Sequence, residues 1–225
     1  RDEDTDNIHS LYVDQWDWEK VISREERNTA TLEHNVRHVY SALKETEQHI
    51  SRRYNYIDTI LPDEIFFITS QELENMYPDC TSKEREYRIA KAKGAVFISQ
   101  IGKILSSGEK HDGRAPDYDD WELNGDIIVY YPVLDIALEL SSMGVRVDEY
   151  SLKRQLKLAD CEDRAELTFQ KSLLNGELPY TVGGGIGQSR ICMFYLRKAH
   201  IGEVQSSIWP EHISKKAEEF NIQLL

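Results

Sequence analysis

The stretch Gly183-Gly184-Gly185-Ile186-Gly187-Gln188-Ser189-Arg190 decides how this chain folds, and the apolar run Ile191-Cys192-Met193-Phe194-Tyr195-Leu196 follows it directly. Because Gly183, Gly185 and Gly187 alternate, a strand here would carry no side chains on one of its faces. A flat group such as a nucleobase can lie against a bare backbone of this kind. The apolar run indicates a buried helix, which places Arg190 in the first turn of that helix.

An arginine at the start of that helix can bind phosphate or stack its guanidinium plane on an aromatic base. Other glycine-rich motifs fit less well. The dinucleotide fingerprint would need glycine at position 188 or 190, and a phosphate-binding P-loop would end in Gly-Lys-Ser/Thr. The alternative is a loop-to-helix joint with a surface arginine. We favour nucleotide binding, because the spacing and the helix context agree.

Composition limits the class of protein. The chain has 225 residues, 40% of them hydrophobic, and a formal net charge of −13. This length suits one large domain or two small ones, and the charge argues against a broad nucleic-acid surface while leaving room for a small anionic ligand. Three widely spaced cysteines without a C-x-x-C motif favour a reduced cytoplasm. Neither a membrane-spanning run nor a signal peptide is visible, so we expect no membrane partner.

Hydrophobic spacing predicts an α+β fold. Apolar residues at steps of three, four and seven predict a long amphipathic helix over 29–54. Capping boxes at Thr69/Glu72 and Thr81/Glu84 predict two further helices, the second ending at Gly94. Strands and helices do not alternate regularly, which favours a mainly antiparallel sheet flanked by helices over a doubly wound parallel one. We expect strands over 11–18, 65–68, 95–98, 127–130 and within 136–147, and helices over 149–159 and 162–174.

A candidate ligand-binding pair lies in the aromatic segment Tyr12–Glu19. Gln15 and Asp17 are two residues apart, so on a strand they share one face. A carboxylate beside an amide suits an α-ammonium group with a polar neighbour. The alternative is a solvated strand face. Since Trp16 and Trp18 suggest a packed setting, we favour the binding interpretation.

Two further segments carry candidate site residues. The loop that begins at Arg114 combines one cation with three carboxylates. The fork of Arg114 can take a carboxylate bidentately, and Asp119 could hold an ammonium or orient that arginine; a surface loop with internal salt bridges is equally compatible. In the strand around 136–147, an unbroken alternation would separate Glu139 from Ser142 and Arg146. We therefore expect a bulge near Gly144.

These motifs together resemble one family. The pattern G-x-G-x-G-x-x-R resembles motif 3 of the class II aminoacyl-tRNA synthetases, and R-x-E followed by Q-x-D resembles motif 2 of their aspartate and asparagine branch. The fuller wording is similar to the ammonia-dependent asparagine synthetases (aspartate–ammonia ligases), which share that fold without using tRNA. The resemblance covers the chain from Arg1 to its C-terminus. Four segments carry it: Tyr12–Glu19, Arg114–Trp121, Glu139–Gly144 and Gly183–Arg190.

The resemblance implies a domain organisation. It implies a single catalytic domain over 1–225 with a class II synthetase-like core, lacking the family's N-terminal part, which carries motif 1 of the dimer interface. A homodimer is therefore expected. Family members usually carry a longer polar loop after Trp121, so a segment is also expected to be missing there.

The resemblance also assigns roles to residues. It implies that aspartate is held by Gln15, Asp17, Arg114, Asp119 and Arg146. It implies that Mg²⁺ is bound by Glu139, with Asp126 as a second metal candidate and Asp135 beside it, since Mg²⁺ needs only one or two carboxylates plus phosphates. ATP contacts are expected from seven residues: Arg1, Glu139, Ser142, Gly183, Gly185, Gly187 and Arg190.

The implied reaction is the ATP-dependent amidation of L-aspartate by ammonia, through a β-aspartyl-adenylate, with release of AMP and pyrophosphate. Arg190, Arg114 and Mg²⁺ on Glu139 would manage the charge of the reacting anions. No residue suggests itself as the base for ammonia. Two alternatives remain: a fragment of an aspartyl- or asparaginyl-tRNA synthetase, and a non-catalytic sensor of amino acid or nucleotide. Such sensors typically lose motif residues that are present here.

Overall fold

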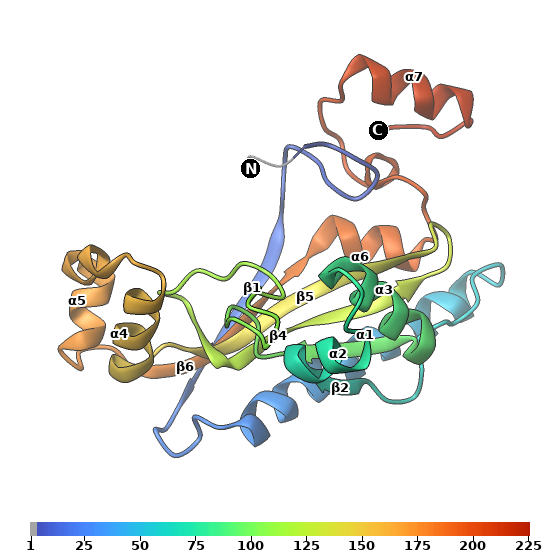
Figure 1. The fold of residues 1–225 in the computed structure, drawn as a ribbon. Helices are drawn as coiled ribbons and strands as arrows, with labels where there is room; N and C mark the ends of the chain where they lie inside the picture. Colours follow the sequence, from blue (N-terminus) through green and yellow to red (C-terminus); the bar gives the residue numbers. More distant parts are fainter. Residues whose placement is uncertain (1–3) are drawn as a thin grey trace.

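A six-stranded sheet forms the centre of the molecule in the computed structural model, which describes residues 4–225. The strand order is β1-β6-β5-β4-β3-β2 (Figure 1). Only β2 and β3 run parallel among these neighbours, so the expected mainly antiparallel sheet is confirmed. The strands are β1 (Gln15–Ile22), β2 (Phe66–Thr69), β3 (Ala95–Ser99), β4 (Asp119–Tyr131), β5 (Ile136–Arg146) and β6 (Tyr180–Gly187).

The helices begin and end largely where the sequence predicts. Thr69 and Thr81 each form a capping box, and Gly94 ends α3 with a positive φ of 79°. The predicted helix over 162–174 is wrong in one respect, because Leu167 is extended and divides it into a 3₁₀ turn and α5. The helices are α1 (Thr29–Arg53), α2 (Ser70–Met76), α3 (Ser82–Lys93), α4 (Glu149–Leu158), η1 (Glu162–Glu166), α5 (Thr168–Leu174), α6 (Gln188–Tyr195), η2 (Ile201–Glu203) and α7 (Glu211–Glu219).

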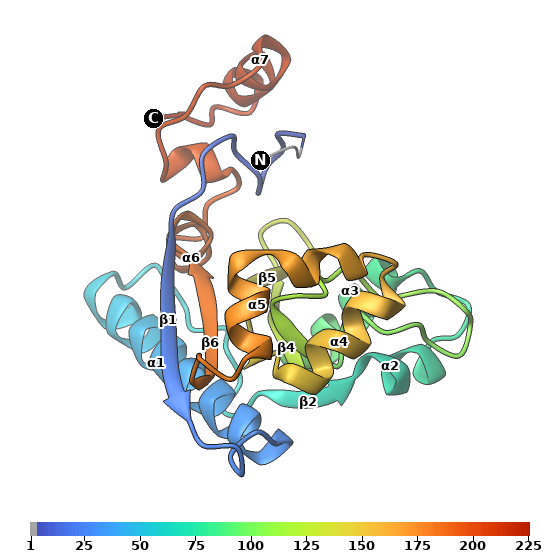
Figure 2. The ribbon, with the colours of Figure 1, turned by 90° about the vertical axis from the view of Figure 1, so that its left-hand side faces the viewer.

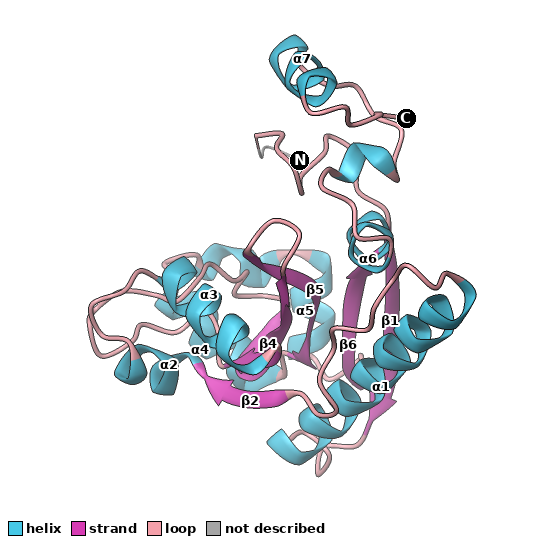
Figure 3. Ribbon diagram, turned by 90° about the vertical axis from the view of Figure 1, so that its right-hand side faces the viewer, coloured by secondary structure: helices cyan, strands magenta, loops and turns pink. Residues whose placement is uncertain are grey.

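Helices cover the two faces of the sheet unequally. On one face, α1 and α6 pack into the largest apolar cluster, where Val36 and Phe194 meet Ile127 and Leu138. On the other face, α3 covers the β3–β4 end through Ile89. Figure 3 shows α1 beside β1 and β6, with α2 and α3 at the β2 end of the sheet. The second face remains accessible toward β1, where Gln15 and Asp17 are exposed, and a ligand could bind there.

The glycine strand occupies the middle of this half of the sheet. The candidate site residues on the strands near 11–18 and 139–146 predict that these two strands are neighbours. This prediction is wrong, because β6 lies between β1 and β5. Figure 2 shows β1 and β6 side by side, with α6 continuing from the end of β6. The first strand also begins later than expected, at Gln15, and ends at Ile22.

A β-bulge reshapes β5. Ile127 pairs with Ser141 while Ile128 pairs with Glu139, which leaves Leu140 as the extra residue. The extra residue of β5 is therefore Leu140, whereas the irregularity near Gly144 lies on the partner strand β4. A second register shift lies on β4, between Asp119 and Asn124, and β4 passes Trp121 as a continuous strand.

The two ends of the described chain lie together on one side of the sheet. Asn7 accepts a backbone hydrogen bond from Ile201, and Gly202 accepts one from Leu225. The figures show α7 protruding there, while α4 and α5 form a separate helical layer (Figures 1 and 2). No helix in residues 4–225 is long and apolar enough to cross a membrane.

Candidate active site

Rows of residues cross the sheet on the face opposite α1. Residues directly opposite each other in antiparallel strands point to the same side. The extra residue at Leu140 shifts the alternation of side chains along β5, so Glu139 and Ser142 point to the same face. This is the effect that the sequence predicted for a bulge in this strand. The rows are Gln15–Gly187, then Asp17–Gly185–Ser142–Asp126, then Glu19–Gly183–Gly144–Asn124, with Arg146 opposite Asp119.

The glycines of β6 make room for side chains from β1. A Cβ atom on Gly185 would lie 2.7 Å from Asp17 Oδ1, and one on Gly183 would lie 2.1 Å from Glu19 Oε2. A Cβ atom on Gly187 would have Arg190 Cβ at 3.5 Å as its nearest neighbour. The bare face expected along the whole strand is therefore open at Gly187, while polar side chains cover the other two glycines.

Arg146 is the centre of an ion cluster at the Gly183 end. Its Nε donates to Glu19 Oε1 at 3.0 Å, its Nη2 donates to Glu19 Oε2 at 2.8 Å, and its Nη1 donates to Asp119. The guanidinium carbon lies 4.2 Å from the centre of the Tyr118 ring. Asp119 thus orients Arg146, and not Arg114 as the sequence suggested.

Burial and charge shift the pKa values in this cluster. Burial raises the pKa of Asp119 even though Arg146 opposes the shift. Burial also acts to raise the pKa of Glu19, but the hydrogen bonds from Arg146 and Thr181 outweigh it and the pKa is lowered overall. Glu19 is therefore a carboxylate at neutral pH.

Arg114 belongs to a second buried pair, with Asp126 in β4. Asp126 is 4% exposed. Burial, followed by repulsion from Glu139, raises the pKa of Asp126 to about 7, while Arg114 and Ser142 act in the opposite direction. Two carboxylates that repel each other on one face would gain from a bound cation.

Arg190 lies in the first turn of α6, as predicted. Its Nη1 donates to the main-chain oxygen of Glu139 at 3.1 Å, which links the start of α6 to the bulged part of β5. Gln15, Gly187, Arg190 and Glu139 all line one solvent-connected hollow at the end of β6. Glu139, Gly187 and Arg190, three of the residues assigned to the nucleotide, therefore meet where the glycine strand is open.

The oxygen donors suit Mg²⁺ better than a metal held entirely by protein. Glu139 and Asp126 offer carboxylates and Ser142 a hydroxyl, and Mg²⁺ usually takes one or two carboxylates together with phosphates. Within residues 4–225, no group of three or more acidic, histidine or cysteine side chains converges as a metal site. Asp135 does not join this set, because it lies at a turn and contacts Lys91 at 2.8 Å and Tyr130 at 2.6 Å.

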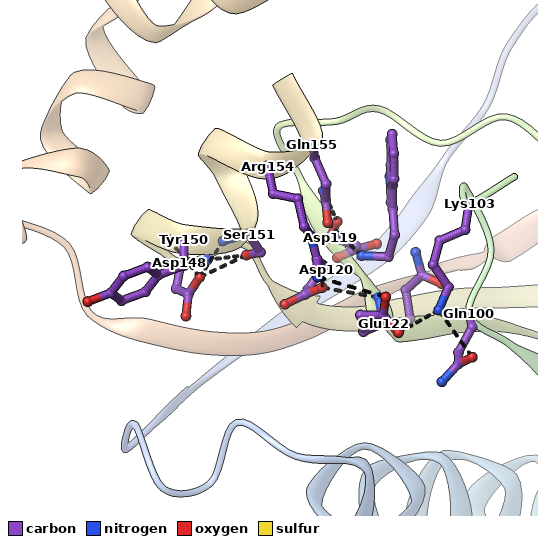
Figure 4. Close-up of polar contacts among 12 residues, drawn as sticks. Gln100, Lys103, Asp119, Asp120, Glu122, Asp148, Tyr150, Ser151, Arg154 and Gln155 are labelled. Carbon is purple, nitrogen blue, oxygen red and sulfur yellow. Dashed lines mark hydrogen bonds and ion pairs between the residues drawn. The ribbon is translucent and has the colours of Figure 1, made fainter. Parts of the chain in front are cut away.

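The buried side-chain amide of Gln155 supports the loop that carries Asp119. Gln155 in α4 is fully buried; its Nε2 donates to the main-chain oxygens of Pro116 at 2.9 Å and Asp119 at 3.0 Å, and its Oε1 accepts from the Trp121 N–H at 2.8 Å. Figure 4 shows Gln155 reaching from α4 toward Asp119. The loop that follows Arg114 thus depends on α4 for its shape.

The sequence analysis did not identify Glu19 as a site residue, and it predicted the wrong setting for Trp16. Glu19 continues the alternation of Gln15 and Asp17, and that signal could have identified it. Trp16 is 54% exposed on an edge strand, so the packed setting expected around it is wrong, whereas Trp18 packs against the core. Arg1 lies outside the described residues.

The fold and this site define a class. An aspartyl-tRNA synthetase from Entamoeba histolytica superposes with a TM-score of 0.64 at 16% identity, covering 91% of this chain and 44% of that one. An asparaginyl-tRNA synthetase from Pyrococcus horikoshii, complexed with asparaginyl-adenylate, gives a TM-score of 0.62 at 12% identity, covering 91% and 50%. The chain thus has the fold of a class II synthetase catalytic core.

Sequence comparison identifies the family within that class. The family described as aspartate-ammonia ligase matches residues 1–221. An aspartate–ammonia ligase of Clostridium perfringens is 66% identical over 225 residues, which are 100% of this chain and 67% of that protein. One from Lactobacillus acidophilus is 59% identical over 226 residues, with coverage of 100% and 67%. The chain belongs to the aspartate–ammonia ligase family and spans about two thirds of the length of these relatives.

Proposed function

We propose that this chain is the catalytic core of an enzyme that forms L-asparagine from L-aspartate, ammonia and ATP, with release of AMP and pyrophosphate. One observation carries the proposal: a carboxylate-and-guanidinium end, with Asp17 and Arg146, shares one sheet face with a nucleotide end, with Gly187, Arg190 and Glu139. An enzyme that joins an amino acid to a nucleotide needs both ends on one surface.

In this proposal the amino-acid substrate lies along β6, across the rows of residues. Successive rows are two residues apart, which is about 7 Å on a strand. Asp17, in the Gly185 row, would bind the α-ammonium group, and Arg146, which lies beyond it, would bind the α-carboxylate. The β-carboxylate then points toward the Gly187 end, where the α-phosphate of ATP would lie.

The chemistry follows from this order. The β-carboxylate attacks the α-phosphorus, pyrophosphate leaves, and a β-aspartyl-adenylate forms. Ammonia then attacks the activated carbonyl carbon, AMP leaves with the C–O bonding electrons, and a proton is released. Arg190, which lines the hollow, would bind and orient the nucleotide and so lower the repulsion between the two reacting anions.

Four finer assignments belong to the same proposal. Glu139, Asp126 and the Ser142 hydroxyl would hold Mg²⁺, which when bound neutralises phosphate charge. We also assign to the site three residues that lie on or beside this face: Gly183, Gly185 and Arg114. We also propose a homodimer, on the family resemblance, and a cytoplasmic location, on the three free cysteines.

The test is product analysis with the intact protein. Aspartate, ammonium and Mg²⁺–ATP should give asparagine, AMP and pyrophosphate in equal amounts. ADP with phosphate would contradict the adenylate route. Attachment of aspartate or asparagine to tRNA would favour a tRNA synthetase, and aspartate or ATP binding without turnover would favour a sensor.

A further inference from the structure

The Glu19–Arg146 contact has the geometry of a bound substrate carboxylate. The Glu19 carboxylate meets the Nε and Nη2 edge of the guanidinium through two oxygens, at 3.0 and 2.8 Å. This two-point fork is the arrangement by which arginine binds a free carboxylate. The guanidinium edge that faces β6 is therefore already occupied by a group from the protein.

The two carboxylates on Arg146 differ in how firmly they are held. The Asp119 side chain is 7% exposed, and its main chain is fixed by Gln155. The Glu19 side chain is 46% exposed and lies on the edge strand, where Thr181 Oγ1 donates to Glu19 Oε1 at 2.5 Å. Glu19 can therefore leave Arg146 into solvent, whereas Asp119 cannot.

Gly183 is what allows Glu19 to reach the arginine. A Cβ atom at this position would lie 2.1 Å from Glu19 Oε2 and 2.6 Å from Arg146 Nη2. Tyr118 stacks on the guanidinium and, together with Asp119, keeps its plane in place when Glu19 departs. The site thus provides a fixed receptor and a removable occupant.

The charges decide what the occupied site would accept. Arg146 carries one positive charge against the two negative charges of Glu19 and Asp119, and Asp17 adds a third negative charge nearby. Arg114 also acts on Asp119, so three negative charges face two positive ones. An incoming carboxylate is repelled while Glu19 stays in place. Aspartate brings two carboxylates, so its entry requires that Glu19 be displaced.

We propose that Glu19 is a built-in competitor of the amino-acid substrate: it occupies Arg146 in the empty site, is displaced by the α-carboxylate, and returns to help expel the product. This inference rests on the proposed function, because it takes Arg146 as the substrate's carboxylate receptor. Asparagine keeps the α-carboxylate of aspartate, so Glu19 would compete with both.

The experiment compares Glu19→Gln with the unmodified intact protein. A neutral amide competes less well for the guanidinium, so the Kd of aspartate from calorimetry should fall by about two- to fivefold, since a half-exposed ion pair no longer has to be broken. Inhibition by asparagine should tighten by a similar factor, and the KM of ATP should stay unchanged. Thr181→Val should act in the same direction with a smaller effect, because it loosens Glu19 without changing its charge.

A matched control removes the same charge elsewhere. Glu149 lies near this end of the sheet and bonds Arg24 and Tyr180, so Glu149→Gln should leave aspartate binding unchanged. A higher Kd of aspartate in Glu19→Gln would overturn the proposal and make Glu19 a ligand for the substrate, and an unchanged Kd would overturn it as well. Failure of the unmodified protein to form asparagine would instead refute the proposed function.

Discussion

Replacing Gly185 with alanine should weaken aspartate binding while leaving the fold intact. The new Cβ atom would lie 2.7 Å from Asp17 Oδ1 and 3.3 Å from Gln15 Nε2, whereas ordinary contacts begin at 3.4 Å. The Asp17 oxygen must therefore move by about 0.7 Å, which exceeds the tolerance of about 0.5 Å for a preorganised binding group.

The size of the effect follows from the contact that is lost. A hydrogen bond to a charged group contributes about 1.5–3 kcal/mol. At about 1.4 kcal/mol per factor of ten, the KM of aspartate should rise about 10- to 140-fold. Stability should not fall much, because Gly185 is not among the glycines with positive φ and alanine restricts the unfolded chain by about 0.4–1 kcal/mol.

The assay measures KM for aspartate and for ATP, together with the melting temperature. Gly187→Ala is the matched control, because its Cβ atom meets Arg190 Cβ at an ordinary 3.5 Å and lies at the nucleotide end. It should affect ATP more than aspartate. If Gly185→Ala left the KM of aspartate within about twofold, or raised that of ATP equally, the assignment of Asp17 to the substrate ammonium group would be wrong.

Three further predictions concern charged residues. Asp17→Asn removes the carboxylate proposed to face the ammonium group, so the KM of aspartate should rise about 10- to 140-fold, from a loss of about 1.5–3 kcal/mol, with little change for ATP; equal effects on both substrates would contradict it. Glu139→Gln should lose activity that raised Mg²⁺ partly restores, whereas Arg190→Lys should not respond to Mg²⁺, because an ammonium cannot reproduce the planar fork; the same Mg²⁺ titration in both variants checks this. Asp148 caps α4 and its pKa is lowered from 3.8, because hydrogen bonds from the first turn of the helix and an ion pair outweigh burial. A carboxyl group with a lowered pKa stabilises the fold at pH values above its unfolded-state pKa, and this stabilisation is lost as the pH falls through the folded-state pKa. Asp148→Asn should therefore reduce the free energy of unfolding at pH 7 and flatten its decline below about pH 4. Parallel denaturation curves of the two proteins in acid would argue against this.

The sequence predicts well those features that depend on local patterns. The capping boxes at Thr69 and Thr81 and the long helix α1 follow from side chains a few residues apart, and the structure confirms them. Alternation also places Gln15 and Asp17 on one face.

Features that depend on distant pairing are predicted less well. The alternating glycines do not predict that β6 lies between β1 and β5, because the strand order depends on contacts between segments that are distant in the sequence. The bulge was expected from the conflict between Glu139 and Ser142, yet its position at Leu140 depends on the register with β4. The partner of Asp119 likewise required the fold, because the sequence suggests Arg114 of the same loop and Arg146 becomes a neighbour only when β4 pairs with β5.

The hydrogen bonds of Gln155 couple the local unfolding of α4 to that of the loop after Arg114. The Trp121 amide is satisfied by a side chain of α4 rather than by another strand, so its exchange with solvent requires α4 to detach. The same detachment would release Pro116 and Asp119, and with them the support of Arg146. Helix α4 lies at the surface, away from the proposed substrate. It nevertheless belongs to the same cooperative unit as Arg146, the proposed receptor for the substrate carboxylate, and the two unfold together.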